Sequence, residues 1–213
     1  MIVRRSFLSF VTVFIFVMIT QINVTIASAS ESETVSVAEL LRPGKVKDRF
    51  EGDVDAPVTI IEYASLTCVH CANFYNEILP EIRKKYIKTG KVKLIFREFA
   101  YDPRATAGFM LARCVPEDRY FPLLDVLFKK QPEWAWQQDA LTPLKKIGLM
   151  AGLTDESFKA CLTNQSILDE VNASFQRGQE LGVHVTPTFF INGKKYEGVE
   201  SVETFFSIID GLL

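Results

Sequence analysis

The chain of 213 residues is poor in several residue types that mark specialised classes of protein. Its four cysteines are too few for a small domain held together mainly by disulfides. Lysine and arginine together number 24 against 26 aspartates and glutamates, so there is no basic excess to neutralise phosphates and we expect no nucleic-acid partner. Hydrophobic residues make up 48%, which is enough for a packed core and excludes a disordered chain.

The first 29 residues lack Asp, Glu and Lys altogether. Arg4 and Arg5 precede an apolar run over residues 7–19, and the small residues Ala27-Ser28-Ala29 follow. That order predicts a secretory signal peptide over residues 1–29. The alternative is an uncleaved membrane anchor, because a bilayer span needs about 20 residues and residues 7–26 are that long. We expect export to the periplasm, where disulfides persist.

Two segments in the first half of the remaining chain have the composition of strands. Residues 30–53 are polar and are interpreted as an N-terminal lead-in with a short element near residues 46–50. Residues 58–64 (VTIIEYA) predict a buried central strand, and residues 91–99 predict a second strand. Between them, apolar residues recur every four positions and predict a helix that Pro80 kinks and Gly90 ends.

Helical spacing dominates the next 80 or so residues, and strand signals return after them. The expected helices cover residues 105–113, 121–128, 141–150, 158–162 and 167–181, with Thr154 and Ser166 as caps. Residues 187–191 then predict a strand, Asn192-Gly193 a tight turn, residues 194–197 a returning strand, and Ser201 the cap of a final helix. This order predicts an α/β fold with one mixed sheet and a helical insertion.

The strongest chemical signal is Cys68-Val69-His70-Cys71, which follows the first strand and opens a helix. Backbone N–H groups and the positive end of the helix dipole stabilise a thiolate at that place. The thiolate is the species that attacks and leaves in disulfide exchange, and a protonated His70 next to the pair favours it further.

Two other interpretations of this motif remain open at this point. A zinc site needs about four ligands, often in two paired motifs. The chain has no second CxxC, and His184 is its only other histidine, so we expect no metal. A static structural disulfide is the other alternative, although short CxxC loops make strained and reducible bridges.

The segment VTIIEYASLTCVHC, together with TPTFFINGK far downstream, resembles the thioredoxin superfamily, and the match is closest to secreted DsbA-like thiol:disulfide oxidoreductases. The resemblance implies a thioredoxin-like mixed sheet with an inserted all-helical domain. Residues 54–101 and 183–213 would form the thioredoxin-like domain, and residues 102–182 the insertion.

The resemblance also implies roles for individual residues. Cys68 would be the exposed attacking cysteine and Cys71 the buried resolving one. Pro187 would form a cis peptide bond facing Cys68, with Val185 and Thr186 offering their backbone to an extended peptide. Substrates would be reduced exported proteins, and a DsbB-like membrane quinone reductase would re-oxidise the pair. No cofactor is implied, and we expect a monomer.

Glu62 lies within the apolar strand, six residues before Cys68. It is either a surface side chain on a strand edge or a buried carboxyl whose pKa is raised. A buried carboxyl at this position could shuttle the proton of Cys71, and the resembling family has an acid there. Lys93 on the next strand is a candidate partner for it.

Cys114 and Cys161 fall on different expected helices of the insertion. They could be free core cysteines, since cysteine packs well as a small apolar group. In an oxidising compartment a proximal pair would usually form a bridge, and some DsbA-like proteins carry a second, non-catalytic disulfide in the helical lobe. We therefore expect a Cys114–Cys161 disulfide.

Thr186 departs from the resembling oxidases, in which the residue before the proline is often Val, whereas Thr is frequent in disulfide isomerases. An isomerase or reductase that uses the same cysteines is therefore an alternative function. A non-catalytic chaperone or binding protein with a thioredoxin fold is another. We expect no separate N-terminal dimerisation domain of the kind that would favour an isomerase.

Overall fold

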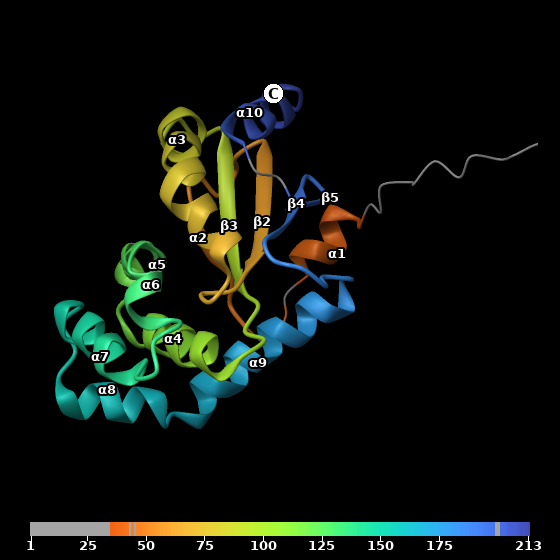
Figure 1. Cartoon of the computed structure of the whole chain (residues 1–213). Helices are drawn as coiled ribbons and strands as arrows, with labels where there is room; N and C mark the ends of the chain where they lie inside the picture. Colours follow the sequence, from red (N-terminus) through yellow and green to blue (C-terminus); the bar gives the residue numbers. More distant parts are fainter. Residues whose placement is uncertain (1–34, 43, 45, 199–200) are drawn as a thin grey trace, which may run out of the picture. The chain divides into compact units, whose positions relative to one another are not determined.

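The structure, a computed structural model, describes residues 35–42, 44, 46–198 and 201–213 (Figure 1). These residues belong to one compact unit. The predicted signal peptide, residues 1–29, lies outside the described residues.

A five-stranded mixed sheet forms the centre of the fold, in the order β1-β3-β2-β4-β5. Its strands are β1 (Arg49–Glu51), β2 (Val58–Ala64), β3 (Val92–Glu98), β4 (Thr188–Ile191) and β5 (Lys194–Glu197). β2 and β3 run parallel, and the other neighbours run antiparallel. Every residue of β2 is buried, as its nearly all-apolar run predicts for a strand covered on both faces.

One face of the sheet is covered by the helical run that starts at Cys68 and by the C-terminal helix. The run consists of α2 (Val69–Asn73), η1 (Phe74–Ile78), α3 (Leu79–Ile82) and η2 (Arg83–Ile87), and the last helix is α10 (Val202–Asp210). The segments η1 and η2 are π-helical, so the run widens on both sides of Pro80, which lacks the N–H of a regular helix. This layer packs on the β2 residues Val58, Ile60 and Ala64.

The opposite face is covered by α1 (Val37–Leu41) and α9 (Gln165–Glu180). Leu40 and Phe175 pack there on Ile61 and Tyr63 of β2. Gly178 allows the close approach of α9, because an added Cβ would lie 2.8 Å from the ring of Phe99. The segment interpreted as a lead-in therefore contributes a helix and, through β1, an edge strand of the sheet.

All regular structure between β3 and β4 is helical, as expected for residues 102–182. The helices are α4 (Pro103–Cys114), η3 (Glu117–Arg119), α5 (Tyr120–Lys129), α6 (Gln131–Trp134), α7 (Leu141–Met150), α8 (Asp155–Leu162) and the long α9. Thr154 caps α8, as predicted. The cap of α9 is Asn164, which accepts from the N–H of Ile167, so the prediction of Ser166 is wrong.

The return to the sheet follows the sequence pattern closely. Asn192 and Gly193 connect β4 to β5 with φ values of 44° and 92°, the left-handed conformation that a two-residue hairpin turn requires. Ser201 accepts from the N–H of Thr204 and caps α10, as predicted. Among the described residues, no helix is long and apolar enough to cross a membrane.

Candidate active site

Cys68 lies where the loop after β2 turns into the helical run. Its backbone is extended, with φ −83° and ψ 123°, and it occupies the N-cap position of α2. The side chain is half-buried and carries a free thiol. Its sulfur is therefore placed beside the first backbone N–H groups of the helix, which have no partner within the helix.

The surroundings of Cys68 lower the pKa of its thiol from 9.0 to about 5. The largest cause is a hydrogen bond from the thiol of Cys71; the Thr186 side chain and the backbone N–H groups of Cys71 and His70 add to it, while burial opposes it. A pKa of about 5 leaves this sulfur almost fully ionised at neutral pH. His70 itself is exposed, and it acts on the thiolate here through its backbone N–H.

Cys71 has the opposite character. It is completely buried, and its thiol is also free. Burial raises its pKa well above the usual value, and the hydrogen bond to Cys68 and the negative charges of Cys68 and Glu62 raise it further. The pair is thus asymmetric, with a nucleophilic outer sulfur and an inner sulfur that keeps its proton.

The loop before β4 closes the site from the other side. The Thr186–Pro187 peptide bond is cis, and the Cys68 thiol donates a hydrogen bond to the Thr186 carbonyl oxygen at 3.2 Å. Pro187 is buried and Val185 is 49% exposed. A cavity of about 320 Å³ lies beside them; its lining comprises His70, Asn73, Ile78, Val185, Thr186, Pro187 and Gly198. The structure therefore brings the CxxC motif and the Thr-Pro motif together although 118 residues separate Cys68 from Thr186.

Glu62 is fully buried in the middle of β2, between Phe96 of β3 and Phe189 of β4. Neither carboxyl oxygen has a hydrogen-bond partner among the described residues. Burial raises its pKa well above 4.5; the positive charge of Arg83 lowers it by a smaller amount, and the negative charge of Cys68 adds to the rise. Lys93 is not its partner, because the ammonium group donates to the Val54 carbonyl oxygen at 3.0 Å, and that expectation is wrong.

The helical insertion holds the reactive loop at three points. The Gln131 amide donates to the carbonyl oxygens of Leu66 and Cys68, at 2.8 and 2.9 Å. Thr67 donates its hydroxyl to Asp102, which also caps α4. The Trp136 indole donates to the Thr67 carbonyl oxygen at 3.3 Å and remains 51% exposed.

These contacts were only partly accessible from the sequence. Asp102 carries the usual signal of an N-cap followed by proline, but that signal does not show that the same carboxyl also binds Thr67. Tyr75 of η1 and Arg83 of η2 interact electrostatically with Glu62, but in the sequence they fit the helix pattern as an ordinary core residue and an ordinary surface residue.

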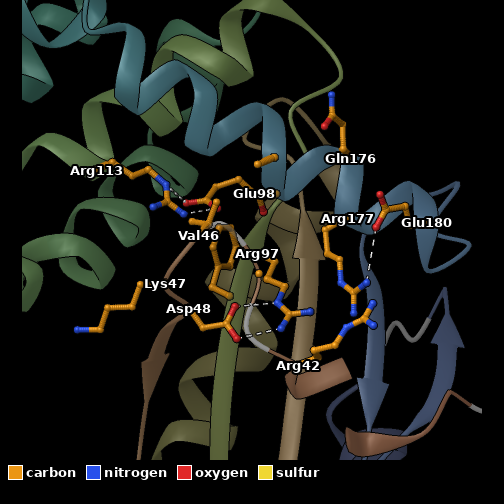
Figure 2. Close-up of a pocket in the computed structure, with 14 residues that line it drawn as sticks. Arg42, Val46, Lys47, Asp48, Arg97, Glu98, Arg113, Gln176, Arg177 and Glu180 are labelled. Atoms are coloured by element: carbon orange, nitrogen blue, oxygen red, sulfur yellow. Dashed lines mark hydrogen bonds and ion pairs between the residues drawn. The ribbon is translucent and has the colours of Figure 1, made fainter. Parts of the chain in front are cut away.

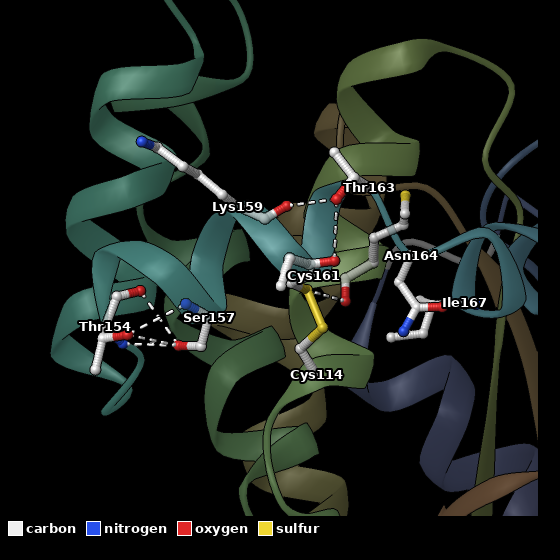
Figure 3. The surroundings of a disulfide bond; sticks show 10 residues. Cys114, Thr154, Ser157, Lys159, Cys161, Thr163, Asn164 and Ile167 are labelled. Carbon is white, nitrogen blue, oxygen red and sulfur yellow. Dashed lines mark hydrogen bonds between the residues drawn. A yellow bond between two sulfur atoms is a disulfide. The ribbon is translucent and has the colours of Figure 1, made fainter.

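The second cysteine pair lies in the helical insertion (Figure 3). Cys114 ends α4 and Cys161 belongs to α8. Their sulfurs form a disulfide with a Cα–Cα distance of 6.0 Å. Cys161 is buried and Cys114 half-buried, so this bridge is packed within the helical insertion.

A larger cavity, of about 540 Å³, lies between β3, α9 and the segment after α1 (Figure 2). It contains no cysteine, and its buried arginines already have carboxylate partners. Arg97 binds Asp48 at 2.8 Å, and Arg113 binds Glu98 at 2.7 Å. The charges of these arginines are thus neutralised within the fold, and neither free cysteine lines this cavity.

The comparisons with known proteins agree with this geometry. A family model described as thioredoxin matches residues 45–211. The crystal structure of α-DsbA1 from Wolbachia pipientis superimposes with a TM-score of 0.76 and 34% identity, covering 82% of this chain and 94% of that one. Disulfide bond formation protein D from Bacillus subtilis is 29% identical, over 67% of each chain.

Proteins from Rickettsia bellii and Rickettsia conorii, provisionally named protein-disulfide oxidoreductases, are 32% and 33% identical over 76% and 78% of this chain. The matches span only 63% and 60% of the length of those relatives. The chain belongs to the thioredoxin superfamily. Within it, the chain belongs to the DsbA-like thiol:disulfide oxidoreductases.

Proposed function

We propose that the chain is an exported dithiol oxidase that introduces disulfides into other exported proteins through Cys68 and Cys71. The observation that carries the proposal is the asymmetry of the pair, with the pKa of Cys68 lowered to about 5 and that of Cys71 raised. A stabilised thiolate is a good leaving group, so a mixed disulfide at Cys68 is resolved in favour of the substrate's own disulfide.

The reaction begins with the Cys68–Cys71 disulfide. A substrate thiolate attacks the Cys68 sulfur, a substrate–Cys68 bond forms, and the Cys71 sulfur leaves and takes a proton from Glu62. A second substrate thiolate then attacks the substrate sulfur of that bond, and Cys68 leaves as a thiolate. The substrate loses two electrons, the enzyme pair gains them, and the deprotonated Glu62 regains its proton from solvent.

The substrate would bind as an extended peptide along the loop before Pro187, with its backbone pairing to Val185 and Thr186. Exposed apolar side chains surround the reactive sulfur and suit an unfolded or partly folded chain; they are Val69, Trp136 and Val185. No metal or organic cofactor takes part in the proposed reaction.

The proposed setting is the periplasm, reached through the predicted signal peptide, where the protein would act as a monomer. A DsbB-like membrane quinone reductase would re-oxidise Cys68 and Cys71 after each turnover. The periplasmic setting is inferred from the sequence pattern of residues 1–29 and from the DsbA-like family. The re-oxidising partner is inferred from the family.

The direct test is an ultraviolet titration of the Cys68 thiolate in the reduced protein. We expect a midpoint near pH 5, and a midpoint near the ordinary value of 9.0 would overturn the proposal. Cys68→Ser should abolish exchange with a reduced peptide. If Cys68→Ser keeps full peptide binding and the wild type shows no exchange, the protein is a binding protein instead.

A reductase or isomerase is the second candidate, and Thr186 favours it. The Thr186 side chain is among the groups that lower the pKa of Cys68, so this residue affects the redox balance. Equilibration with glutathione separates the candidates. A potential near that of thioredoxin, about −270 mV, supports a reductase, and a clearly more positive potential supports the oxidase.

A further inference from the structure

Four buried side-chain nitrogen or oxygen atoms in the described part of the chain have no hydrogen-bond partner. Three of them belong to two residues: the carboxyl oxygens of Glu62 and the hydroxyl oxygen of Tyr75. A buried polar atom without a partner costs about 1–3 kcal/mol, so native proteins rarely keep one without a reason. That these three atoms share one side of the sheet points to a common role.

Glu62 and Tyr75 face the same layer of the core. Glu62 alternates along β2 with Ile60 and Ala64, which pack under the helical run, and Tyr75 belongs to η1 in that run. The Tyr75 ring lies 5.9 Å from the ring of Phe96, which pairs with Glu62 in the register of β2 and β3.

The Tyr75 side chain is also fixed by packing. Its ring stacks on Phe128 at a centroid distance of 4.1 Å and contacts Phe74 at 6.0 Å. The residue is 3% exposed. Its hydroxyl therefore cannot turn to bulk solvent, and a buried polar group or water molecule is the partner left to it.

We propose that Tyr75 is a positioning residue for the proton of Glu62, with its hydroxyl linked to the carboxyl group through a buried water molecule. The inference rests on the proposed function, in which Glu62 exchanges a proton with Cys71. When Glu62 gives up that proton, a bare carboxylate would remain in an apolar layer at high cost. A hydrogen bond donated along the Tyr75–water link stabilises the carboxylate until it is reprotonated.

The charged and titratable groups around Glu62 support this role. The groups that act on Glu62 come from the helical run: Cys68 at the N-cap of α2, Cys71 in α2, Tyr75 in η1 and Arg83 in η2. Its neighbours on β3 and β4 are the uncharged Phe96 and Phe189. The only positive group in this set is Arg83, whose guanidinium lies 5.9 Å from the Tyr75 ring centre.

Arg83 also links this interior to the surface. Its guanidinium binds Glu51 of β1 at 2.7 Å and Asp125 of α5 at 2.9 Å. The Arg83 side chain is 18% exposed, Glu51 is 23% exposed and Asp125 is 41% exposed. The positive charge of Arg83 therefore lies beside the Tyr75 ring, while its hydrogen bonds go to two carboxylates that reach the surface.

The test uses Tyr75→Phe in the oxidised full-length protein, with infrared difference spectroscopy of the protonated Glu62 carbonyl band across pH. Glu62→Gln identifies the band by removing it. Loss of one hydrogen bond to the carboxylate should raise the midpoint of that band by about one pH unit. Tyr86→Phe is the matched control, because the Tyr86 hydroxyl binds Asp210 at 2.8 Å outside this layer, and it should leave the midpoint unchanged.

The pH–rate profile of reaction with a reduced peptide separates this inference from the proposed function. The rate should fall as Glu62 loses its proton, and Tyr75→Phe should move that descending limb upward by about one pH unit. A limb that persists in Glu62→Gln overturns the shuttle role of Glu62. A carbonyl midpoint that is the same in Tyr75→Phe and wild type overturns the role of Tyr75 alone.

If Tyr75→Phe does not fold, the frequency of the protonated Glu62 carbonyl band in the wild type tests the proposed link. A carbonyl frequency typical of a carboxyl group without hydrogen bonds contradicts the proposed link, and a hydrogen-bonded frequency supports it.

Discussion

Two regions of the molecule contain the same four kinds of side chain, but their cysteines, buried glutamates and tyrosines are in opposite states. Each has a pair of cysteines, a buried glutamate on the sheet, a tyrosine and an arginine. In the reactive region these are Cys68 with Cys71, Glu62, Tyr75 and Arg83. In the region where the insertion meets β3 they are Cys114 with Cys161, Glu98, Tyr120 and Arg113.

The second region is fully paired. Glu98 accepts from Arg113 at 2.7 and 2.9 Å and from the Tyr120 hydroxyl at 2.7 Å. Burial alone would raise the pKa of Glu98, but the charge and hydrogen bonds of Arg113 and the hydrogen bond of Tyr120 outweigh it, so the pKa is lowered. Glu62 is equally buried but has no direct partner, and its pKa is raised.

Burial by itself therefore does not decide whether the pKa of a buried glutamate is raised or lowered. A glutamate with an arginine and a tyrosine in contact stays ionised and joins two parts of the fold. A glutamate of the same burial without those contacts has a raised pKa. In the second region the arginine binds the buried glutamate, whereas in the first region Arg83 binds Glu51 and Asp125 and leaves Glu62 without a direct partner.

The largest change in stability is expected from Glu98→Leu. It leaves the Arg113 guanidinium, which is 4% exposed, with only Glu170 as an ionic partner. Breaking a buried ion pair in this way costs about 3–5 kcal/mol, which urea unfolding at pH 7 would measure. Glu170→Leu is the control; Glu170 is 41% exposed, so its loss should cost about 1 kcal/mol or less. Equal losses for the two variants would contradict this account.

The Cys114→Ala/Cys161→Ala double variant should lose about 2–4 kcal/mol of stability, because a bridge across 47 residues restricts the unfolded chain. Exchange at Cys68 should be unchanged, since within the part of the chain that the structure describes no hydrogen bond or ion pair joins this pair to the CxxC motif. The two measurements are urea unfolding and the rate of oxidation of a reduced peptide. A double variant that keeps its stability and loses exchange would reverse the roles given to the two pairs.

Glu62→Leu is expected to act in the opposite direction and raise the free energy of unfolding by about 1–3 kcal/mol at pH 8. The sign follows from the raised pKa. The protonated form of Glu62 contributes fully below the ordinary pKa of 4.5, and that contribution is lost as pH rises through the folded-state pKa. The advantage of the variant should therefore grow with pH, whereas a constant advantage would contradict the raised pKa.

Glu98 should show the opposite pH dependence in the same unfolding series. Its lowered pKa means that its contribution is present above 4.5 and is lost as pH falls through the folded-state pKa.

The sequence predicts the elements of this fold wherever local chemistry determines them. The β-branched run of β2, the Asn192-Gly193 turn and the Thr154 and Ser201 caps each carry a short-range signal, and all are present. The sequence does not place the edge strand β1 in the sheet, because three residues, of which one is exposed, are too short to show the alternation of a strand. Their pairing with β3 depends on the sheet already being formed.

For the site, the CxxC and Thr-Pro motifs can be recognised in the sequence because each has a fixed local spacing. The direction of the pKa shift of the two buried glutamates cannot be predicted from the sequence, because it depends on partners from distant segments. Arg113 follows Glu98 by 15 residues and contacts it, whereas Lys93, directly across from β2, contacts the Val54 carbonyl instead. Only the packed structure shows which charge reaches which carboxyl.

Gln131 has a mechanical consequence for the whole reactive end. Its amide group, which belongs to the helical insertion, donates hydrogen bonds to the carbonyl oxygens of Leu66 and Cys68, on both sides of Thr67. The insertion cannot move away from the sheet without breaking these two hydrogen bonds or moving the backbone of Cys68 with it. A movement of α6 is therefore transmitted to the backbone that carries the Cys68 sulfur.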